Sequence, residues 1–481
     1  MRISSFFSLF FAFFAPSRFN PVSAAFGRGS SIGVHCVEWL HESPARRTRP
    51  FAWLGGVGRW GRDGEGMAET ITQTSEPPMD LLAAVGQAAR SVSVDYFNYD
   101  PADTSISFAG GLPDPESLPT NDVAQATVKA LAEHGKTALQ YGRVGGYKPL
   151  VDFLRDKLKR TQMMDIPEDG ILLTAGSMQA LTFVVSLLVD RGDTIISEDP
   201  VWPGGVGLFN TIGAKVVTVP LDGQGMRVDV LEERLAALKA QGVRPKFIYT
   251  LPTFQNPAGV TAPIERRLRI LELAAEYHTF VFEDDAYNDL RFDGEPLPAI
   301  YALDRERGGS RVISIGTFSK ILGAGMRIGW VVAPPAIISK IAGLKGDGGV
   351  SPFATTTTAE FCLAGKLEPH IELLKGVYQR KRDAMVGALE EHMPEGVTWT
   401  VPDGGFFLWL TVPEGVNTAK LAAVAAREGV EYLPGVACRF GGAGLNEIRL
   451  SFSVMTEEQI REGISRLGRL IHRAMSGKIQ D

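Results

Sequence analysis

From about residue 170 to residue 333, short apolar runs rich in β-branched residues alternate with longer stretches of helical period. The apolar runs predict buried strands, and the amphipathic stretches predict helices. Strands that alternate with helices favour a mostly parallel central sheet that helices cover on both faces. The expected strands lie at 170–173, 194–197, 215–219, 246–250, 279–283, 312–316 and 328–333, and the expected helices at 178–189, 228–240 and 263–277.

A different pattern begins after about residue 350 and predicts a smaller α+β domain. The expected order is a helix at 368–392, a strand at 405–410, a helix at 418–427, a strand at 447–452 and a last helix at 457–475. We therefore expect an α/β protein in four parts. These are a targeting segment or extension (1–66), an N-terminal arm with a connecting segment (67–120), a large domain (121–345) and a small C-terminal domain (346–481).

Residues 1–66 have a composition of their own, with eight Arg, no Lys and four acidic residues. Arg2, the Phe-rich run at 6–15 and the small residues at 23–25 have the form of a secretory signal. With the Arg- and Ser-containing stretch that follows, they also resemble the two-part targeting sequences of algal plastids. The alternative is that Met67 is the true start and that residues 1–66 are a gene-model extension. The first interpretation predicts a plastid or another organelle, and the second predicts the cytoplasm.

The composition excludes several classes of protein. The chain has 481 residues, of which 44% are hydrophobic and 22% charged, and these values exclude a disordered, collagen-like or coiled-coil protein. The net charge of −6 argues against a nucleic-acid partner. Three cysteines that lie far apart argue against a disulfide scaffold and against a cysteine metal site. No apolar run reaches 18 residues, so we expect no membrane-spanning helix.

A lysine with hydroxyl neighbours follows the strand expected at 312–316. Thr317 and Ser319 lie just before Lys320, and Arg327 comes seven residues after the lysine. The hydroxyls and the arginine could bind phosphate oxygens, and the apolar strand would desolvate the amine, which suits a Schiff-base lysine. The alternative is an ordinary solvated surface lysine.

An aspartate follows the strand expected at 279–283. Asp284 would lie beyond the carboxyl end of a strand, which is where ligands bind in parallel sheets. A buried carboxylate needs a cationic partner, and a protonated pyridine nitrogen would serve, since the carboxylate would raise the pKa of that nitrogen. The alternative is an acidic loop or a helix N-cap.

Two turns between expected elements complete the candidate chemistry. In the first, a strand ends in small residues at Gly176 and Ser177, where free backbone N–H groups and the helix dipole could bind an anion. Ser177 could equally be a simple N-cap. The second turn spans 251–259 and contains Asn256, whose alternative role is to cap its own backbone.

The order and spacing of these motifs resemble the pyridoxal-phosphate-dependent aminotransferases of fold type I, class I/II. Within this family the chain is most similar to the 2-aminoadipate/kynurenine and aromatic branch, because the sequence FAGGLPDP at 108–115 resembles a segment typical of that branch. The resemblance covers roughly residues 80–475. The motifs that carry it are Tyr141-Gly142, Gly176-Ser177, Asp199-Pro200-Val201-Trp202, Gln255-Asn256-Pro257, Asp284 with Ala286-Tyr287, Ser319-Lys320 with Arg327, and Arg449.

The resemblance implies a role for each of these residues around the cofactor ring. Lys320 would bind pyridoxal 5'-phosphate covalently and then move a proton during the reaction. Asp284 would pair with the pyridine nitrogen, and Trp202 would stack on the ring. Asn256 and Tyr287 would donate hydrogen bonds to the phenolic oxygen.

The resemblance also implies a phosphate site, a substrate site and a second subunit. Arg449 would hold the substrate α-carboxylate, with Gly111 and Asn256 beside it. Tyr141 would reach the phosphate of the partner subunit, which implies a homodimer. The branch usually has Gln where Met178 stands, so only the backbone of this residue is expected to contact the cofactor. The expected phosphate ligands are Ser177, the Met178 backbone, Thr317, Ser319 and Arg327.

The function implied is a transaminase that moves the amino group of an α-amino acid (2-aminoadipate, kynurenine, aromatic or similar) to a 2-oxo acid such as 2-oxoglutarate. One alternative keeps the cofactor but changes the reaction to that of a β-lyase, a decarboxylase or an aminocyclopropane-carboxylate synthase. Another is a transcriptional regulator built on this fold, although residues 1–66 show no pattern of a DNA-recognition helix. The sequence does not decide which amino acid is the preferred donor.

Overall fold

The computed structural model describes residues 82–89 and 105–478. The predictions for residues 1–66 lie outside this part of the chain. Within the described residues, no helix is long and apolar enough to cross a membrane. The expected boundaries of the large and small domains stay predictions.

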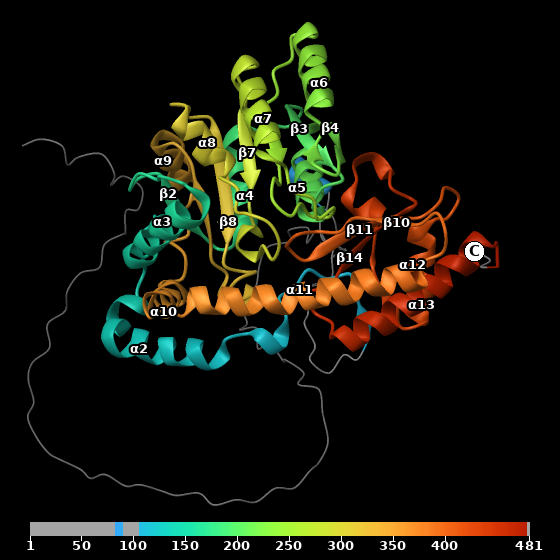
Figure 1. The fold of residues 1–481 in the computed structure, drawn as a ribbon. Helices are drawn as coiled ribbons and strands as arrows, with labels where there is room; N and C mark the ends of the chain where they lie inside the picture. Colours follow the sequence, from blue (N-terminus) through green and yellow to red (C-terminus); the bar gives the residue numbers. More distant parts are fainter. Residues whose placement is uncertain (1–81, 90–104, 479–481) are drawn as a thin grey trace, which may run out of the picture. The chain divides into compact units, whose positions relative to one another are not determined.

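A mostly parallel sheet of eight strands forms the centre of the chain, as the alternating pattern predicts (Figure 1). Its strand order is β2-β9-β8-β7-β6-β3-β4-β5, and the run from β8 to β4 is parallel throughout. The pairings of β9 with β2 and β8 and of β5 with β4 are antiparallel. The strands are β2 (Ile171–Thr174), β3 (Thr194–Asp199), β4 (Lys215–Asp222), β5 (Gly225–Met226), β6 (Phe247–Thr250), β7 (Phe280–Asp284), β8 (Val312–Thr317) and β9 (Gly329–Val332).

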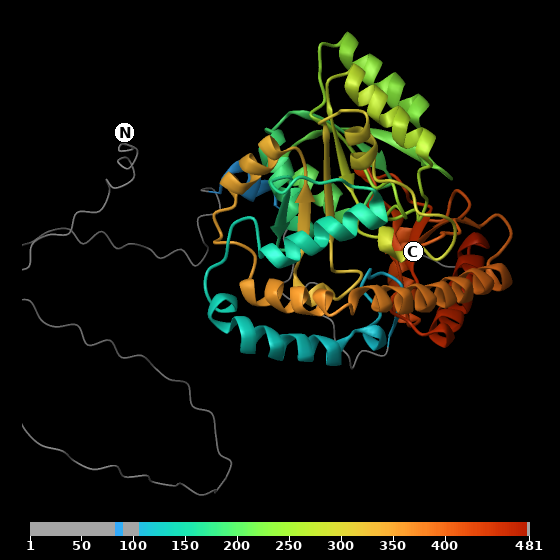
Figure 2. The same cartoon turned by 60° about the vertical axis from the view of Figure 1, so that its left-hand side comes forward.

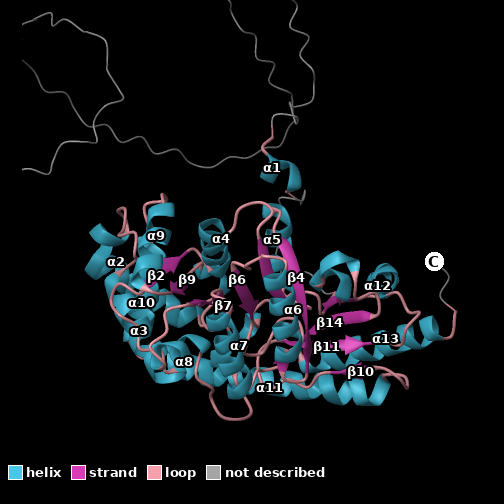
Figure 3. Cartoon of the chain, turned by 90° about the horizontal axis from the view of Figure 1, so that it is seen from above, coloured by secondary structure: helices cyan, strands magenta, loops and turns pink. Residues whose placement is uncertain are grey.

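Helices cover both faces of this sheet, and Figure 3 shows the strands between the two helical layers. Successive strand residues point to opposite faces, so Phe282 and Ile313 pack in one layer while Val281 and Val312 pack in the other. The layer around Phe282 contains α4 (Ser177–Leu188), α5 (Pro203–Ile212) and α9 (Pro335–Leu344). The other contains α3 (Lys148–Gln162), α6 (Val228–Ala240), α7 (Ile264–Glu276) and α8 (Ile300–Glu306).

A second sheet of four antiparallel strands, with order β10-β11-β14-β13, lies in the C-terminal part. The short strand β1 (Ile106–Ser107) pairs with β12 (Val430–Glu431), so the chain before the central sheet joins this region. The other elements here are β10 (Thr398–Trp399), β11 (Phe407–Thr411), β13 (Leu433–Pro434), β14 (Glu447–Ser451), α11 (Leu367–His392), α12 (Thr418–Arg427) and α13 (Glu457–Met475).

Seven helices of the described residues were not expected from the periodicity, namely α3, α5, α8 and α9 above and three more. Figure 2 shows α2 (Thr120–Ala138) beside α10 (Pro352–Leu363), and α10 also contacts α3. The short helix α1 (Ala84–Ala88) contacts α5. Ala occupies the buried positions of α2 and Thr occupies several of those of α10, so large apolar side chains do not mark the buried faces of these two helices in the sequence.

Candidate functional site

Lys320 follows β8 closely and lies in a cluster of buried groups. Its Nζ donates a hydrogen bond of 2.7 Å to the carbonyl of Gly111. Burial, together with the charges of Arg449 and Arg327, lowers the pKa of Lys320 to about 8. A lysine of this pKa has a substantial neutral fraction near neutral pH, which a nucleophilic or basic amine requires.

Asp284 is the last residue of β7, which pairs in parallel with β8. It is 4% exposed, and its Oδ2 accepts a hydrogen bond of 2.6 Å from the Tyr249 hydroxyl. Burial raises the pKa of Asp284 to about 6, and the hydrogen bond from Tyr249 opposes this rise. Because burial penalises the charged carboxylate, a cationic ring nitrogen beside it would be favourable to both groups.

Arg449 of β14 contacts two segments that are remote from it in the sequence. Its Nη1 donates to Oδ1 of Asn256 at 3.0 Å, and its Nη2 donates to the carbonyl of Ala109 at 2.5 Å. The guanidinium carbon lies 4.3 Å from the centre of the Phe407 ring. These contacts orient a planar fork of donors, which is the geometry that binds a carboxylate with two hydrogen bonds.

Tyr287 borders the same cluster. Burial raises the pKa of its hydroxyl, while the charge of Arg449 and a hydrogen bond with Asn256 act against this rise. The Tyr287 ring packs edge-on against Phe406, with 5.4 Å between ring centres. Nζ of Lys320 lies 6.0 Å from the Tyr287 ring and 5.6 Å from the Phe406 ring. The structure therefore places a lysine, an arginine, an amide and a phenol around one position.

A turn with free backbone donors lies next to Arg327. Gly176 has a positive φ of 82° and precedes Ser177, the first residue of α4. Nη2 of Arg327 donates to the carbonyl of Ala175 at 3.3 Å, and a Cβ on Gly176 would lie 2.7 Å from this nitrogen. A Cβ on Gly329 would lie 2.7 Å from the backbone nitrogen of Ser177. Glycines thus let the helix N-terminus, a strand and a guanidinium approach one another, an arrangement whose donors suit an anion.

The two hydroxyls that precede Lys320 form a small network of their own. The Thr317 hydroxyl donates to Oγ of Ser319 at 2.8 Å and to the carbonyl of Ile328 at 3.2 Å. The same oxygen accepts a hydrogen bond from the Ser319 backbone N–H at 3.0 Å. Because Ile328 is adjacent to Arg327, this network holds both hydroxyls close to the proposed anion site.

Three further predicted residues lie at the start of α4, before α5 and after α2. Met178 is the second residue of α4, and its side chain is partly exposed. Trp202 precedes α5 and packs against the core layer around Phe282. Tyr141 is 86% exposed, and its ring lies beside Gly348. Tyr141 is therefore accessible to a second molecule and is not buried within this subunit.

The sequence analysis missed Glu198, a fully buried carboxylate at the end of β3. It accepts hydrogen bonds from the Thr250 hydroxyl, from the Leu251 N–H at 3.1 Å and from Nε2 of Gln255 at 3.2 Å. Burial raises the pKa of Glu198 to about 7. Gln255 also donates to the carbonyl of Pro200 at 2.8 Å, so it ties two loops at the carboxyl edge of the sheet. An acidic residue inside an apolar strand was the available signal.

The residues described above fit pyridoxal 5'-phosphate. The turn at Gly176 and Ser177, with Arg327, offers donors for a phosphate, and the glycines leave the room that a Cβ would fill. Asp284 offers a buried carboxylate for the pyridine nitrogen. Lys320 offers an amine of lowered pKa for the aldehyde carbon.

Comparisons with known proteins agree with this geometry. A sequence model of the family described as aminotransferase class I and II matches residues 106–467. Aromatic-amino-acid aminotransferase 1 of Thermococcus litoralis is 42% identical over 372 residues, which cover 77% of this chain and 88% of the relative. The crystal structure of a multiple substrate aminotransferase from Thermococcus profundus has a TM-score of 0.78 at 40% identity and covers 83% and 99% of the two chains. An alpha-aminoadipate aminotransferase of Thermus thermophilus, solved with N-(5'-phosphopyridoxyl)-L-leucine, has a TM-score of 0.73 at 35% identity and covers 77% and 93%.

Proposed function

The chain belongs to the class I and II aminotransferases, and from this premise we propose that it transfers the amino group of an aromatic or 2-aminoadipate-like amino acid to a 2-oxo acid such as 2-oxoglutarate. The family, the fold type, the cofactor pyridoxal phosphate and the transaminase class predicted from the sequence are confirmed. The lyase, decarboxylase, synthase and regulator alternatives are not favoured, because relatives named aminotransferases match this chain at 42% and 36% identity. Two relatives named HTH-type transcriptional regulators match at 27% and 30%. The preferred amino donor is our proposal.

The contacts of Lys320 and Arg449 are the observation that carries this proposal. Nζ of Lys320 bonds to the carbonyl of Gly111, and Nη2 of Arg449 bonds to the carbonyl of Ala109, two residues earlier. The amine and the guanidinium therefore flank one short stretch of chain. An α-amino acid has its carboxylate bonded directly to its α-carbon, so a carboxylate bound by Arg449 would direct the α-carbon toward Lys320.

The residues divide the chemistry among them. Bound pyridoxal phosphate supplies an electron sink for negative charge at the substrate α-carbon. Arg449 binds the substrate carboxylate with its planar fork, which orients the α-carbon toward Lys320. Nζ of Lys320 would take the proton from that carbon, and its lowered pKa suits an amine that accepts a proton and later gives one up. The Asp284 carboxylate would hold the ring nitrogen and favour its protonated form.

Aromatic side chains support the proposed donor class. The rings of Phe406, Phe407 and Tyr287 pack against one another beside Lys320 and Arg449. An apolar wall next to the α-carboxylate site favours a donor with a large side chain. The names of the similar enzymes from Thermococcus litoralis and Thermus thermophilus agree with aromatic and 2-aminoadipate donors.

A panel of amino donors tests the proposal. The purified protein with pyridoxal phosphate is mixed with each donor and 2-oxoglutarate, and the glutamate formed is measured. We expect the highest kcat/KM with phenylalanine, tyrosine, kynurenine or 2-aminoadipate, and no product when the oxo acid is omitted. Release of ammonia or carbon dioxide from the donor at full rate without an oxo acid would indicate a lyase or a decarboxylase. A preference for alanine or aspartate would contradict the donor class alone.

We also propose that the enzyme is a homodimer. Tyr141 is 86% exposed and Leu139 is 74% exposed, and both lie just after α2. Large apolar groups that gather on a surface favour a protein contact, and Tyr141 would there reach the phosphate site of the second subunit. Sedimentation velocity measures the assembly. We expect Tyr141→Phe to stay dimeric with a weaker affinity for pyridoxal phosphate, and a monomeric, fully active wild type would contradict the proposal.

A further inference from the structure

Residues 108–118, called the Gly-Pro segment here, border the active site without forming a regular helix or sheet strand for most of their length. The carbonyls of Ala109 and Gly111 accept hydrogen bonds from Arg449 and Lys320. A Cβ on Gly111 would lie 2.5 Å from the Phe407 ring, so the backbone itself packs on this ring. Hydrogen bonds with Glu431 and Ser451 hold the backbone of Phe108 at one end, so the position of the rest of the segment depends on contacts at its other end.

A buried ion pair fastens the far end of this segment to α11. Nζ of Lys381 donates to Oδ1 of Asp114 at 2.7 Å, and the two side chains are 9% and 7% exposed. The same ammonium donates to the carbonyls of Ser453 at 3.0 Å and Val454 at 3.3 Å. All three ammonium donors therefore have partners, as a buried lysine requires.

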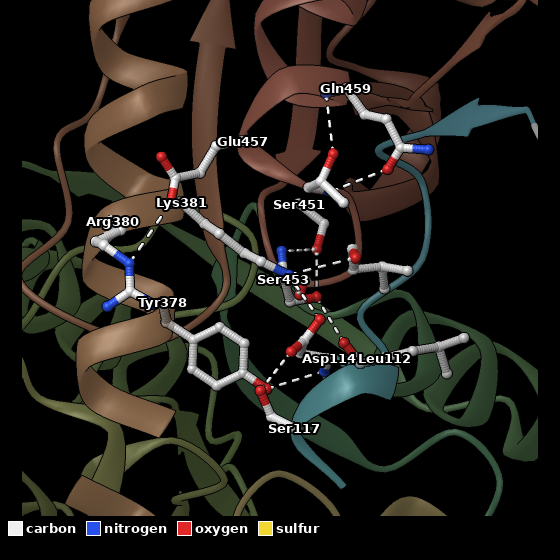
Figure 4. A network of polar contacts seen from close by, with 12 residues as sticks. Leu112, Asp114, Ser117, Tyr378, Arg380, Lys381, Ser451, Ser453, Glu457 and Gln459 are labelled. Carbon is white, nitrogen blue, oxygen red and sulfur yellow. Dashed lines mark hydrogen bonds and ion pairs between the residues drawn. The ribbon is translucent and has the colours of Figure 1, made fainter. Parts of the chain in front are cut away.

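Neighbouring hydrogen bonds extend this fastening, as Figure 4 shows. The Asp114 backbone N–H donates to the Tyr378 hydroxyl at 3.0 Å, and the Ser117 hydroxyl donates to Oδ2 of Asp114. The Ser453 hydroxyl donates to the carbonyl of Leu112 at 2.6 Å. Both backbone and side-chain groups of the segment are therefore hydrogen-bonded to α11 or to Ser453.

Tyr378 connects this network to the catalytic cluster. Tyr378 and Lys381 are three residues apart on α11 and so lie on the same face of the helix. The Tyr378 ring packs 4.7 Å from the Phe406 ring, measured between centres, and Nζ of Lys320 lies 5.6 Å from Phe406. A displacement at the ion pair would therefore reach both the Gly-Pro segment and the aromatic wall.

We propose that the Asp114–Lys381 pair positions the Gly-Pro segment as a wall of the amino-acid site, so that it controls the binding of both substrates. Asp114 and Lys381 are positioning residues, because they act through Leu112 and the carbonyls of Ala109 and Gly111. A buried ion pair is weak evidence for stability, since apolar residues of similar volume often serve as well. The Asp114–Lys381 pair instead holds the Gly-Pro segment in a single position. The proposal rests on the proposed transaminase function.

Lys381→Met and the double variant Asp114→Asn/Lys381→Met test this role. The single variant leaves a buried carboxylate without its cation and so loses stability, whereas the double variant removes both charges and regains much of it. In both variants we expect the KM of the amino donor and of the oxo acid to rise roughly tenfold, the scale of one lost charged hydrogen bond. The spectrum of the bound cofactor should not change, because its proposed phosphate ligands lie on α4 and near β8 and β9.

Hydrogen exchange of the backbone amides supplies a readout that does not depend on activity. Residues 108–118 should exchange faster in both variants, while residues 312–332 keep the wild-type rate. Arg380→Gln is the matched control. Arg380 lies on α11 beside Lys381 and forms an exposed ion pair with Glu457 of α13, so its replacement should change neither KM nor exchange.

Two results would overturn the proposal. One is a folded Lys381→Met enzyme with wild-type KM values and wild-type exchange at 108–118. The other is a double variant whose KM values return to normal together with its stability, which would give the pair a stabilising role alone. A wild type that transfers no amino group would instead refute the proposed function, and the exchange experiment would then decide whether the pair holds the segment.

Discussion

The Tyr249 hydroxyl lies 2.6 Å from Oδ2 of Asp284, and both side chains are buried on neighbouring parallel strands. Tyr249 is held rigidly, because its ring packs edge-on against Phe209 and Phe282 with centres 5.2 Å and 5.4 Å apart. The hydroxyl can donate to only one acceptor, and that acceptor is the carboxylate assigned to the ring nitrogen. Tyr249 therefore sets both the orientation and the basicity of Asp284.

Replacement of Tyr249 by Phe should make Asp284 easier to protonate. The hydrogen bond favours the charged carboxylate, so its loss raises the pKa of Asp284 above the present value of about 6. The acidic limb of the pH profile of kcat/KM should then move to higher pH, because the carboxylate is lost earlier as the pH falls. Tyr301→Phe, at a buried tyrosine of α8, is the control. An unmoved acidic limb in Tyr249→Phe would show that the phenol does not tune Asp284.

Removal of the Lys320 amine tests covalent attachment of the cofactor. Lys320→Ala should abolish transamination and also the borohydride-trapped link between protein and pyridoxal phosphate. Lys340→Ala, at an exposed lysine of α9, should leave both unchanged. Mass spectrometry of the reduced protein identifies the modified residue. A trapped link at any other lysine in the wild type would reject the assignment.

Asp284→Asn tests the partner of the ring nitrogen. Without the negative charge, cofactor binding should persist while proton abstraction becomes slower. Its activation free energy should rise by about 3 kcal/mol or more, the scale of a lost preorganised electrostatic contact. Neighbouring carboxylates cannot substitute. Burial raises the pKa of Asp285 to about 8, so it is mostly neutral, and Glu283 accepts hydrogen bonds from the Ile300 and Tyr301 N–H groups. Single-turnover kinetics measures the step, and near-normal rates would contradict this argument.

Glu198→Gln should change how stability depends on pH. Burial raises the pKa of Glu198 from 4.5 to about 7, so the folded state binds one more proton than the unfolded state between these values. The stability that Glu198 contributes is therefore present below about pH 4.5 and is lost as the pH rises toward 7. Between pH 4.5 and 7, the free energy of unfolding of the variant should therefore fall by about 3 kcal/mol less than that of the wild type. Urea titrations at several pH values measure it, with exposed Glu276→Gln as control.

The sequence predicted elements well where one pattern ran for many residues. The buried strands of the large sheet are continuous apolar runs, and α6, α12 and α13 begin and end where the periodicity places them. Strands β10, β12 and β13 have two residues each and were missed. A run that short has no detectable period, so its pairing partner determines it.

Contacts between residues that are far apart in the sequence could not be predicted from it. Tyr249 resembles an ordinary core residue and Glu198 is an acidic residue in an apolar strand, but the partners of both depend on the order β7-β6-β3, which no local pattern encodes. Asp114 and Lys381 are 267 residues apart, and each alone resembles a solvated charge. The family resemblance could locate Lys320 because its neighbours form a local motif.

Arg449→Lys separates substrate binding from cofactor chemistry. The variant keeps the charge but loses the planar fork that the Phe407 ring and Asn256 hold in place, so one of two hydrogen bonds to the α-carboxylate should be lost. We expect kcat/KM to fall roughly 10- to 100-fold, the scale of one charged hydrogen bond.

This loss should be similar for every amino acid and oxo acid, because the α-carboxylate is the group that all of them share. Cofactor affinity and spectrum should stay close to wild type, since the proposed phosphate donors at Ser177 and Arg327 are unchanged. Arg461→Lys, at an exposed arginine of α13, is the control for a general effect of the substitution. Steady-state kinetics with several donors decides the matter. If only acidic donors lose activity, Arg449 binds the distal carboxylate, and another group must hold the α-carboxylate.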